Sequence, residues 1–193
     1  MIVGLYTRFF ALVLLVINTA LVKSSGYYTY GVDYFISMSL VYIILYPSDS
    51  YYSLRSKFSR KLRKTNFLIV KRTMQFHLCF AYMISGLEKL SGYNWRNGES
   101  IWKAIHLPNF DNDFNVNVDF LGKYPIIFVV IGWLTIIIEL LYPLFTSIKK
   151  TREMWLYLTI GLHLSIVLFL NLYFFSAIMI IWNITTFYSF DKK

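Results

Sequence analysis

Long apolar stretches alternate with short polar segments along most of the chain. Four of them cover residues 5–22, 31–46, 66–90 and 124–148, although only 73–87 of the third is free of charged residues. A helix rises about 1.5 Å per residue, so about 20 residues cross the roughly 30 Å hydrocarbon core of a bilayer. We therefore predict that each of these stretches is a membrane-spanning helix.

The last apolar stretch, 154–190, is longer still and contains no Asp, Glu, Lys or Arg. As one helix it would be about 55 Å long, which exceeds the hydrocarbon core even for a tilted helix. We therefore predict a helical hairpin that turns at 171–173. The expected fold is all-α: a polytopic transmembrane helical bundle of about six spans, forming one domain over residues 1–193.

The composition supports a membrane protein. Hydrophobic residues make up 57% of the 193 and charged residues 15%, against about 45–50% and about 25% in soluble domains, and the mean hydropathy is +0.53. These values exclude a soluble enzyme and a disordered chain. The single cysteine, Cys79, excludes an intramolecular disulfide and a multi-cysteine metal site. The three histidines are too scattered to indicate a zinc site, so no metal is predicted.

The net charge of +9 is unevenly distributed. Lys and Arg concentrate in 55–72, 149–152 and 192–193, whereas 92–123 holds several acidic residues. Six alternating spans place all the basic segments on one side, which the positive-inside rule assigns to the cytoplasm. We therefore predict a multi-pass cell-membrane protein with both termini in the cytoplasm and 92–123 outside. The basic run 55–64 also suits nucleic acid, but contact with anionic lipid of the bilayer explains it better, so no nucleic-acid partner is predicted.

Ionisable side chains inside the predicted spans are candidates for function, because burying a charge in hydrocarbon is costly. Tyr82, Ser85 and Lys89 follow the i, i+3, i+7 spacing of one helix face, and Gly86 allows another helix to approach closely. Lys89 stands at the outer end of its span, where partial desolvation favours the neutral amine that a general base requires. The simpler alternative is a lysine whose ammonium group reaches into the interface.

Glu139 and His163 are the other two candidate catalytic residues. Glu139 is the only charge in its stretch, so it must be paired or protonated, with Lys89 or His163 as candidate partners. Pro143 is expected to kink the same helix about one turn later. The imidazole of His163 either transfers protons or hydrogen-bonds across helices.

The predicted outer segment begins with aromatic and polar residues. Trp95 and Trp102 are typical interface anchors, while Arg96 and Glu99 either line an extracytoplasmic opening or are simply solvated. Together with two polar positions of the preceding span, this segment supplies the candidate substrate-binding residues, which are Gln75, Tyr82, Trp95 and Arg96.

A longer ordered set of residues runs through the chain. Its members, in order, are Gly31, Asp33, Ser53, Leu54, Gln75, Tyr82, Gly86, Leu87, Lys89, Leu90, Trp95, Gly98, Glu139, Leu140, Pro143, Thr151, Arg152, Gly161, His163, Phe175, Ser176 and Met179. This order resembles the HTTM family, the membrane domain shared with the vitamin K-dependent gamma-carboxylases. The resemblance covers most of the chain.

The resemblance implies that Lys89 corresponds to the base that deprotonates vitamin K hydroquinone in the animal carboxylases, and His163 to a helical histidine of the same site. This sequence differs from theirs because Glu88 stands where they have a second lysine and the 193 residues contain no soluble domain. The family's first spans are also expected to be missing. A bacterial branch, which includes small proteins that mature a sporulation-delaying antimicrobial peptide, is similar in size.

Two hypotheses of function follow. In the first, a membrane enzyme or maturation factor acts on an exported peptide or a lipidic quinone at the outer face, with Lys89 as general base and with Glu139 and His163 tuning or relaying its proton. In the second, the protein is a non-catalytic membrane subunit. It exports an antimicrobial peptide, assembles with it or gives immunity to it, or it binds a second membrane protein. Its polar residues then hold helices together. The Lys-, Asn-, Tyr- and Phe-rich composition suits a bacterium. The residues themselves assign no cofactor.

Overall fold

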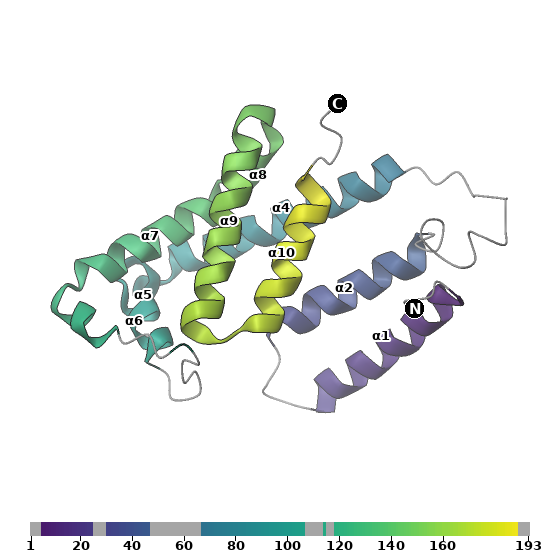
Figure 1. Cartoon of the computed structure of the whole chain (residues 1–193), viewed down its shortest axis with the longest axis horizontal. Coiled ribbons are helices and arrows are strands. Elements are labelled where there is room, and N and C mark those ends of the chain that lie inside the picture. Colours follow the sequence, from purple (N-terminus) through teal and green to yellow (C-terminus); the bar gives the residue numbers. More distant parts are fainter. Residues whose placement is uncertain (1–4, 25–29, 47–66, 107–113, 115–117, 189–193) are drawn as a thin grey trace. The chain divides into compact units, whose positions relative to one another are not determined.

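The computed structural model describes residues 5–24, 30–46, 67–106, 114 and 118–188, and all regular secondary structure in these residues is helical (Figure 1). The chain divides into two compact units, Met1–Lys71 and Arg72–Lys193, each of which is described separately. The all-α prediction is therefore confirmed for the described residues. The basic run 55–64 and the C-terminal lysines lie outside them.

The first unit contains two helices that lie against each other, α1 (Thr7–Ser24) and α2 (Gly31–Leu45). Their bounds agree to within two residues with the predicted stretches 5–22 and 31–46. Both helices are mainly apolar, and a hydrogen bond links them: the Asn18 amide donates to the Ser37 hydroxyl at 2.9 Å.

The second unit is built on α4 (Phe67–Ser91), whose last five turns belong to it, and on a helical hairpin. The hairpin consists of α9 (Lys149–Leu170) and α10 (Tyr173–Phe187), which lie side by side (Figure 1). The predicted turn is confirmed, because Asn171 ends α9 in the left-handed region at φ +53°, where asparagine is tolerated better than most residues. The predicted start at 154 was wrong, since α9 begins five residues earlier.

The predicted fourth span, 124–148, is two helices instead of one. Helix α7 (Ile126–Leu140) ends just before Leu141, and α8 (Tyr142–Ser147) starts there with Pro143 in its first turn. Proline has no N–H to donate to the carbonyl four residues earlier, and its ring clashes with that carbonyl. The disturbance expected from Pro143 is therefore found, and α7 ends three residues before the proline.

The predicted outer segment 92–123 contains short helices: α5 (Tyr93–Arg96), α6 (Glu99–Ile105) and the 3-10 helix η2 (Asp119–Lys123). Two glycines allow α5 and the start of α6 to pack closely against α7. A Cβ on Gly98, which has φ +82°, would lie 2.6 Å from the Val129 backbone nitrogen, and a Cβ on Gly132 would collide with the Trp95 carbonyl oxygen. The chain after α4 is therefore folded back onto α7.

By length and composition, two described helices can cross a membrane: α1 with 18 residues and α9 with 22. Helices α2, α7 and α10 are apolar but have 15 residues each. Helix α4 has 25 residues but carries charges at both ends, from Lys71 to Lys89. The helices thus follow the predicted apolar stretches, and the count of six spans stays a prediction.

Candidate functional site

A close helix crossing brings two of the three candidate catalytic residues together. Gly86 in α4 faces the backbone of α7 so tightly that a Cβ would lie 2.7 Å from the Leu140 nitrogen and 3.0 Å from its Cα. The expected close approach at Gly86 is therefore confirmed. One turn further along α4, Lys89 faces Glu139, the residue before Leu140.

Lys89 and Glu139 form an ion pair at this crossing. The Lys89 Nζ donates to Glu139 Oε2 at 2.6 Å and to the Ser85 hydroxyl at 2.6 Å. Only 17% of the Lys89 side chain and 8% of the Glu139 side chain are exposed. The ammonium also stands 5.0 Å from the centre of the Trp95 ring in α5, within the range of a cation–π contact. Of the two candidate partners for Glu139, Lys89 is therefore the one that it contacts in the structure.

His163 instead joins a neutral, buried hydrogen-bond network that connects four helices. Its Nε2 lies 2.8 Å from the Tyr82 hydroxyl, which accepts a bond from the Asn183 amide at 2.8 Å. The Tyr142 hydroxyl donates to Asn183 Oδ1 at 2.7 Å. The rings of Tyr82 and Tyr142 stack at 4.1 Å, and none of the four side chains is more than 3% exposed.

The partners of this network fix where its hydrogens lie. The Asn183 amide nitrogen faces the Met179 carbonyl at 2.8 Å, which can only accept, so this nitrogen donates both there and to Tyr82. The single Tyr82 hydrogen is then left for His163 Nε2. With Nε2 as acceptor, neutral His163 carries its proton on Nδ1, and that buried nitrogen has no partner among the described residues.

The ion pair and the network are close enough to act on each other. The Glu139 charge acts electrostatically on Tyr82, and the Lys89 charge acts on His163. Tyr82 and Lys89 are seven residues apart in α4, which corresponds to about 10 Å along the helix. The geometry therefore combines an ion pair with a nearby set of hydrogen-bonded groups, arranged along one face of α4.

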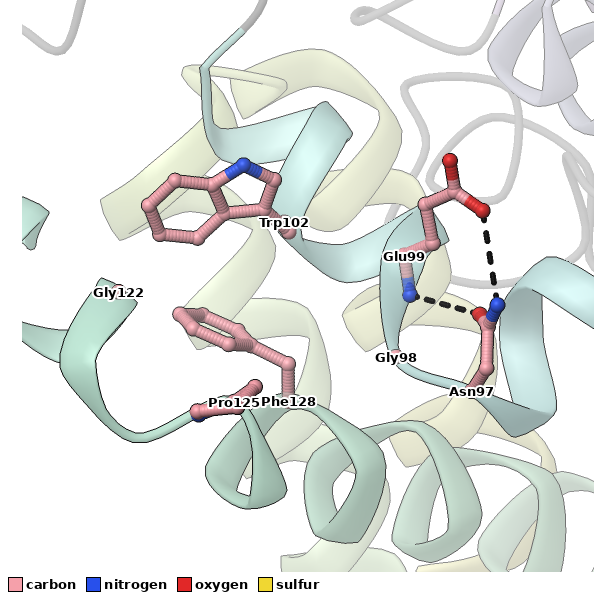
Figure 2. Close-up of a pocket in the computed structure, with 7 residues that line it drawn as sticks. All are labelled: Asn97, Gly98, Glu99, Trp102, Gly122, Pro125 and Phe128. Carbon is pink, nitrogen blue, oxygen red and sulfur yellow. Dashed lines mark hydrogen bonds between the residues drawn. The ribbon is translucent and has the colours of Figure 1, made fainter.

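An outer cavity of about 340 Å³ lies between α6, η2 and α7 (Figure 2). The rings of Trp102 and Phe128 face each other edge-on at 5.1 Å, and the Glu99 carboxylate points away from them (Figure 2). Glu99 is bonded to Lys103 at 2.6 Å and to Asn97 at 3.5 Å, and both bonds lower the pKa of its carboxyl. The cavity is therefore mainly an aromatic slot with a charged rim.

The predicted substrate-binding residues are spread over the second unit. Tyr82 belongs to the buried network, and Trp95 covers Lys89. Gln75 lies 14 residues before Lys89, or about 21 Å along α4, and its amide donates to the Thr186 carbonyl at 3.2 Å. Arg96 is exposed, and its side chain forms no hydrogen bond or ion pair with any described residue. The structure therefore does not bring these four residues into one site.

Sequence reasoning missed Asn183 and Tyr142, although both are fully buried in the network. The signal for Asn183 was present, because it is a lone amide in the apolar stretch 180–184. Such residues in apolar helices usually bond across to another helix. Nothing in the sequence singled out Tyr142, since tyrosine is common in this chain.

In the described part of the chain, no three His, Cys, Asp or Glu side chains gather as metal ligands. Comparison with known proteins adds no neighbour, because no family model, curated protein or solved structure matches the chain.

Proposed function

We propose that the protein is a multi-pass integral membrane protein of HTTM type with about six spans. The apolar side chains on its surface support this, since α7 leaves Val130, Ile131 and Leu134 between 39% and 53% exposed. A water-soluble protein rarely exposes so many large apolar groups together. In a bilayer the same surface contacts lipid at no cost. The ordered residues that resemble the HTTM family support the family assignment.

In this proposal both termini are cytoplasmic, and α5, α6 and η2 lie at the extracytoplasmic face. Lys149, Lys150 and Arg152 then lie at the cytoplasmic end of α9, as the positive-inside rule requires. Fusions of alkaline phosphatase test the orientation. We expect high activity for a fusion after Trp102 and low activity after Lys150, and the reverse result would invert the topology.

The function we propose is action on an exported peptide at the extracytoplasmic face, with Lys89 as general base in its maturation. The observation that carries this is the 2.6 Å contact between Lys89 Nζ and Glu139 Oε2, at the same end of α4 as the outer cavity. Trp95 of α5 contacts Lys89 and packs against α7 at Gly132, and α7 also lines the cavity through Phe128. The aromatic slot, where a peptide side chain would bind, is therefore connected to the ion pair through α5 and α7.

The pair itself provides a route to a free amine. A proton moves from the Lys89 ammonium to the Glu139 carboxylate along their hydrogen bond, which leaves a neutral amine and a neutral carboxylic acid. Low dielectric surroundings favour this neutral pair relative to separated charges. The amine then takes a proton from the substrate, and Glu139 holds the first proton until the reaction is complete. Ser85 keeps the amine oriented throughout.

A quinone is the further group that the family resemblance implies. The unpartnered Nδ1–H of His163 is a donor that a quinone oxygen would fit. However, neither the outer cavity nor the 400 Å³ cavity beside Arg152 is lined by His163 or Lys89. We therefore assign no quinone to the site.

Mass spectrometry of the peptides that the native host exports tests the proposal. We compare the wild type, a deletion strain, Lys89→Ala and the control Lys149→Ala, which alters an exposed lysine at the start of α9, outside the proposed peptide site. The expected result is a peptide that stays unprocessed, or lacks the mass of carbon dioxide, in the deletion and Lys89→Ala strains only. Normal peptides from a Lys89→Ala strain would refute the role of Lys89.

A non-catalytic membrane subunit is the alternative, and one observation favours it. Lys89 already uses its ammonium on Glu139, Ser85 and the Trp95 ring, as an interhelical link would. The double variant Lys89→Met/Glu139→Leu separates the two functions, because apolar replacement of a buried pair often preserves stability. Normal abundance without peptide maturation supports catalysis, whereas normal abundance with full maturation supports the structural role.

A further inference from the structure

A second cavity, of about 400 Å³, lies at the opposite end of the second unit from Lys89. Gln75 and Cys79 of α4 line it together with Pro143 and Thr146 of α8, Arg152 of α9 and Phe187 of α10. Gln75 is about 21 Å from Lys89 along α4. The cavity is therefore separate from the proposed peptide site.

Arg152 is held rigidly at this cavity. Its Nε donates to the Thr146 carbonyl at 2.7 Å, and its Nη2 donates to the Ser147 carbonyl at 3.3 Å. A guanidinium group has five N–H donors in one plane, so three remain available. Among the described residues no carboxylate lies within ion-pair distance of Arg152, not even that of its neighbour Glu153. A fixed, half-buried cation with donors to spare is thus present in the cavity wall.

The surroundings of Arg152 repel cations and attract anions. Lys149 and Lys150 precede it in the first turn of α9, where there is no acidic residue and no side-chain cap. Arg72 lies one turn before Gln75 in α4 and is exposed. Acidic groups normally stabilise a helix N-terminus, whereas the first four residues of α9 include the cations Lys149, Lys150 and Arg152. A bound anion would balance this positive charge.

The mouth of the cavity also offers an apolar surface. Phe76 lines the cavity with 73% of its surface exposed, and it stacks on Phe80, which is 50% exposed, with ring centres 6.2 Å apart. The two rings continue along α4 towards the centre of the proposed membrane span. A ligand that fits this surface therefore combines an anionic group, placed at Arg152, with a long apolar chain, placed along Phe76 and Phe80.

From this arrangement we infer that the cavity binds the phosphate group of an anionic phospholipid of the cytoplasmic leaflet. The planar donors of a guanidinium group match phosphate oxygens in geometry and charge, and basic pockets between helices at this face are suited to lipid headgroups. The inference rests on the membrane insertion proposed above. It does not depend on peptide chemistry at Lys89.

Cys79 provides the readout, because it is the single cysteine of the chain and lines the cavity. The full chain, purified in a neutral detergent, is treated with N-ethylmaleimide, and the rate of Cys79 modification is measured. Phosphatidylglycerol is expected to slow the reaction about tenfold at ten times its dissociation constant, because bound protein is shielded. Phosphatidylcholine with the same acyl chains should slow it little.

Two variants identify the group that binds the lipid. Arg152→Gln should abolish the protection, whereas the control Lys150→Gln should keep most of it. Should Arg152→Gln not accumulate, Arg152→Lys is used, and weakened protection is expected because a single ammonium cannot match the planar guanidinium donors. Equal protection by both lipids, no protection by phosphatidylglycerol, or full protection by inorganic phosphate alone would overturn the proposal. Normal peptide maturation in the Lys89→Ala strain, with lipid protection intact, would refute only the peptide function.

Discussion

The second unit contains two Lys–Glu pairs of equal length in different surroundings. Lys89 bonds to Glu139 at 2.6 Å, and Lys103 bonds to Glu99 at 2.6 Å. The first pair joins two helices with side chains 17% and 8% exposed, whereas the second joins neighbouring turns of α6 with side chains 62% and 40% exposed. Distance alone therefore does not distinguish them. Their energetic importance is expected to differ because water screens only the second pair.

The hydrogen-bond network around His163 is a third polar cluster, which is more deeply buried and carries no charge. Tyr82, Asn183, Tyr142 and His163 satisfy one another by hydrogen bonds and leave one buried N–H without a partner among the described residues. Charged and neutral clusters thus follow the same rule, which is that a buried polar group needs a partner. The charged and neutral clusters are expected to differ in how much stability the protein loses when that partner is removed.

The largest loss of stability is expected when the buried Lys89–Glu139 pair is broken from one side. Lys89→Met leaves the Glu139 carboxylate without a counter-ion, and such a loss typically costs about 3–5 kcal/mol. Lys89→Met/Glu139→Leu should recover most of that stability. Thermal unfolding of the variants in a mild detergent measures both effects. Equal unfolding temperatures for the single variant and the wild type would show that the pair is not structurally important.

The second-largest loss of stability is expected when Asn183, the centre of the neutral network, is replaced. Asn183→Leu deprives the Tyr142 hydroxyl of its acceptor and the Tyr82 hydroxyl of its donor, at about 1–3 kcal/mol for each buried group left unsatisfied. Thr185→Val is the control two residues later, because its exposed hydroxyl bonds only within α10. The same unfolding assay should show a clear loss for Asn183→Leu and almost none for the control.

These two clusters also show what could be predicted from the sequence. Lys89, Glu139 and His163 were recognisable because ionisable residues in apolar stretches are unusual, and the glycine at 86 indicated a close helix crossing. Which of them pair was not predictable, since this depends on distances between helices far apart in the chain. Asn183 shows the same limit, because its partners come from α4 and α8.

The helices show a similar division between local and distant causes. Apolar runs located α1, α2 and α4 to within about two residues, because such runs are a local property of the sequence. The short helices α5 and α6 were not predicted. They are too short to show a periodic pattern, and contacts of Gly98 and Gly132 with distant parts of the chain hold them in place.

Gly86→Ala should weaken the buried pair without altering either charge. The new Cβ would lie 2.7 Å from the Leu140 nitrogen, so α4 and α7 must move apart, and overpacking of this kind costs about 1–3 kcal/mol. Gly161→Ala is the matched control, because a Cβ there meets nothing within 4 Å and alanine favours the helix by up to about 1 kcal/mol. In thermal unfolding, Gly86→Ala is expected to lower the unfolding temperature and Gly161→Ala to raise it. Equal effects would contradict the close crossing.

The exposed pair should show the smallest effect, and its pH dependence completes the comparison. Hydrogen bonds from Lys103 and then from Asn97 lower the pKa of the Glu99 carboxyl. The small stabilisation that these bonds provide is therefore present above the ordinary glutamate pKa. It disappears as the pH falls through the lowered pKa of Glu99. Glu99→Gln should therefore unfold like the wild type at acidic pH and nearly like it at pH 7, with any difference reduced further by salt. Lys89→Met should remain strongly destabilised at pH 7 in high salt, because salt screens buried pairs much less than exposed ones. A loss of stability in Glu99→Gln as large as that in Lys89→Met would show that burial does not separate the two pairs.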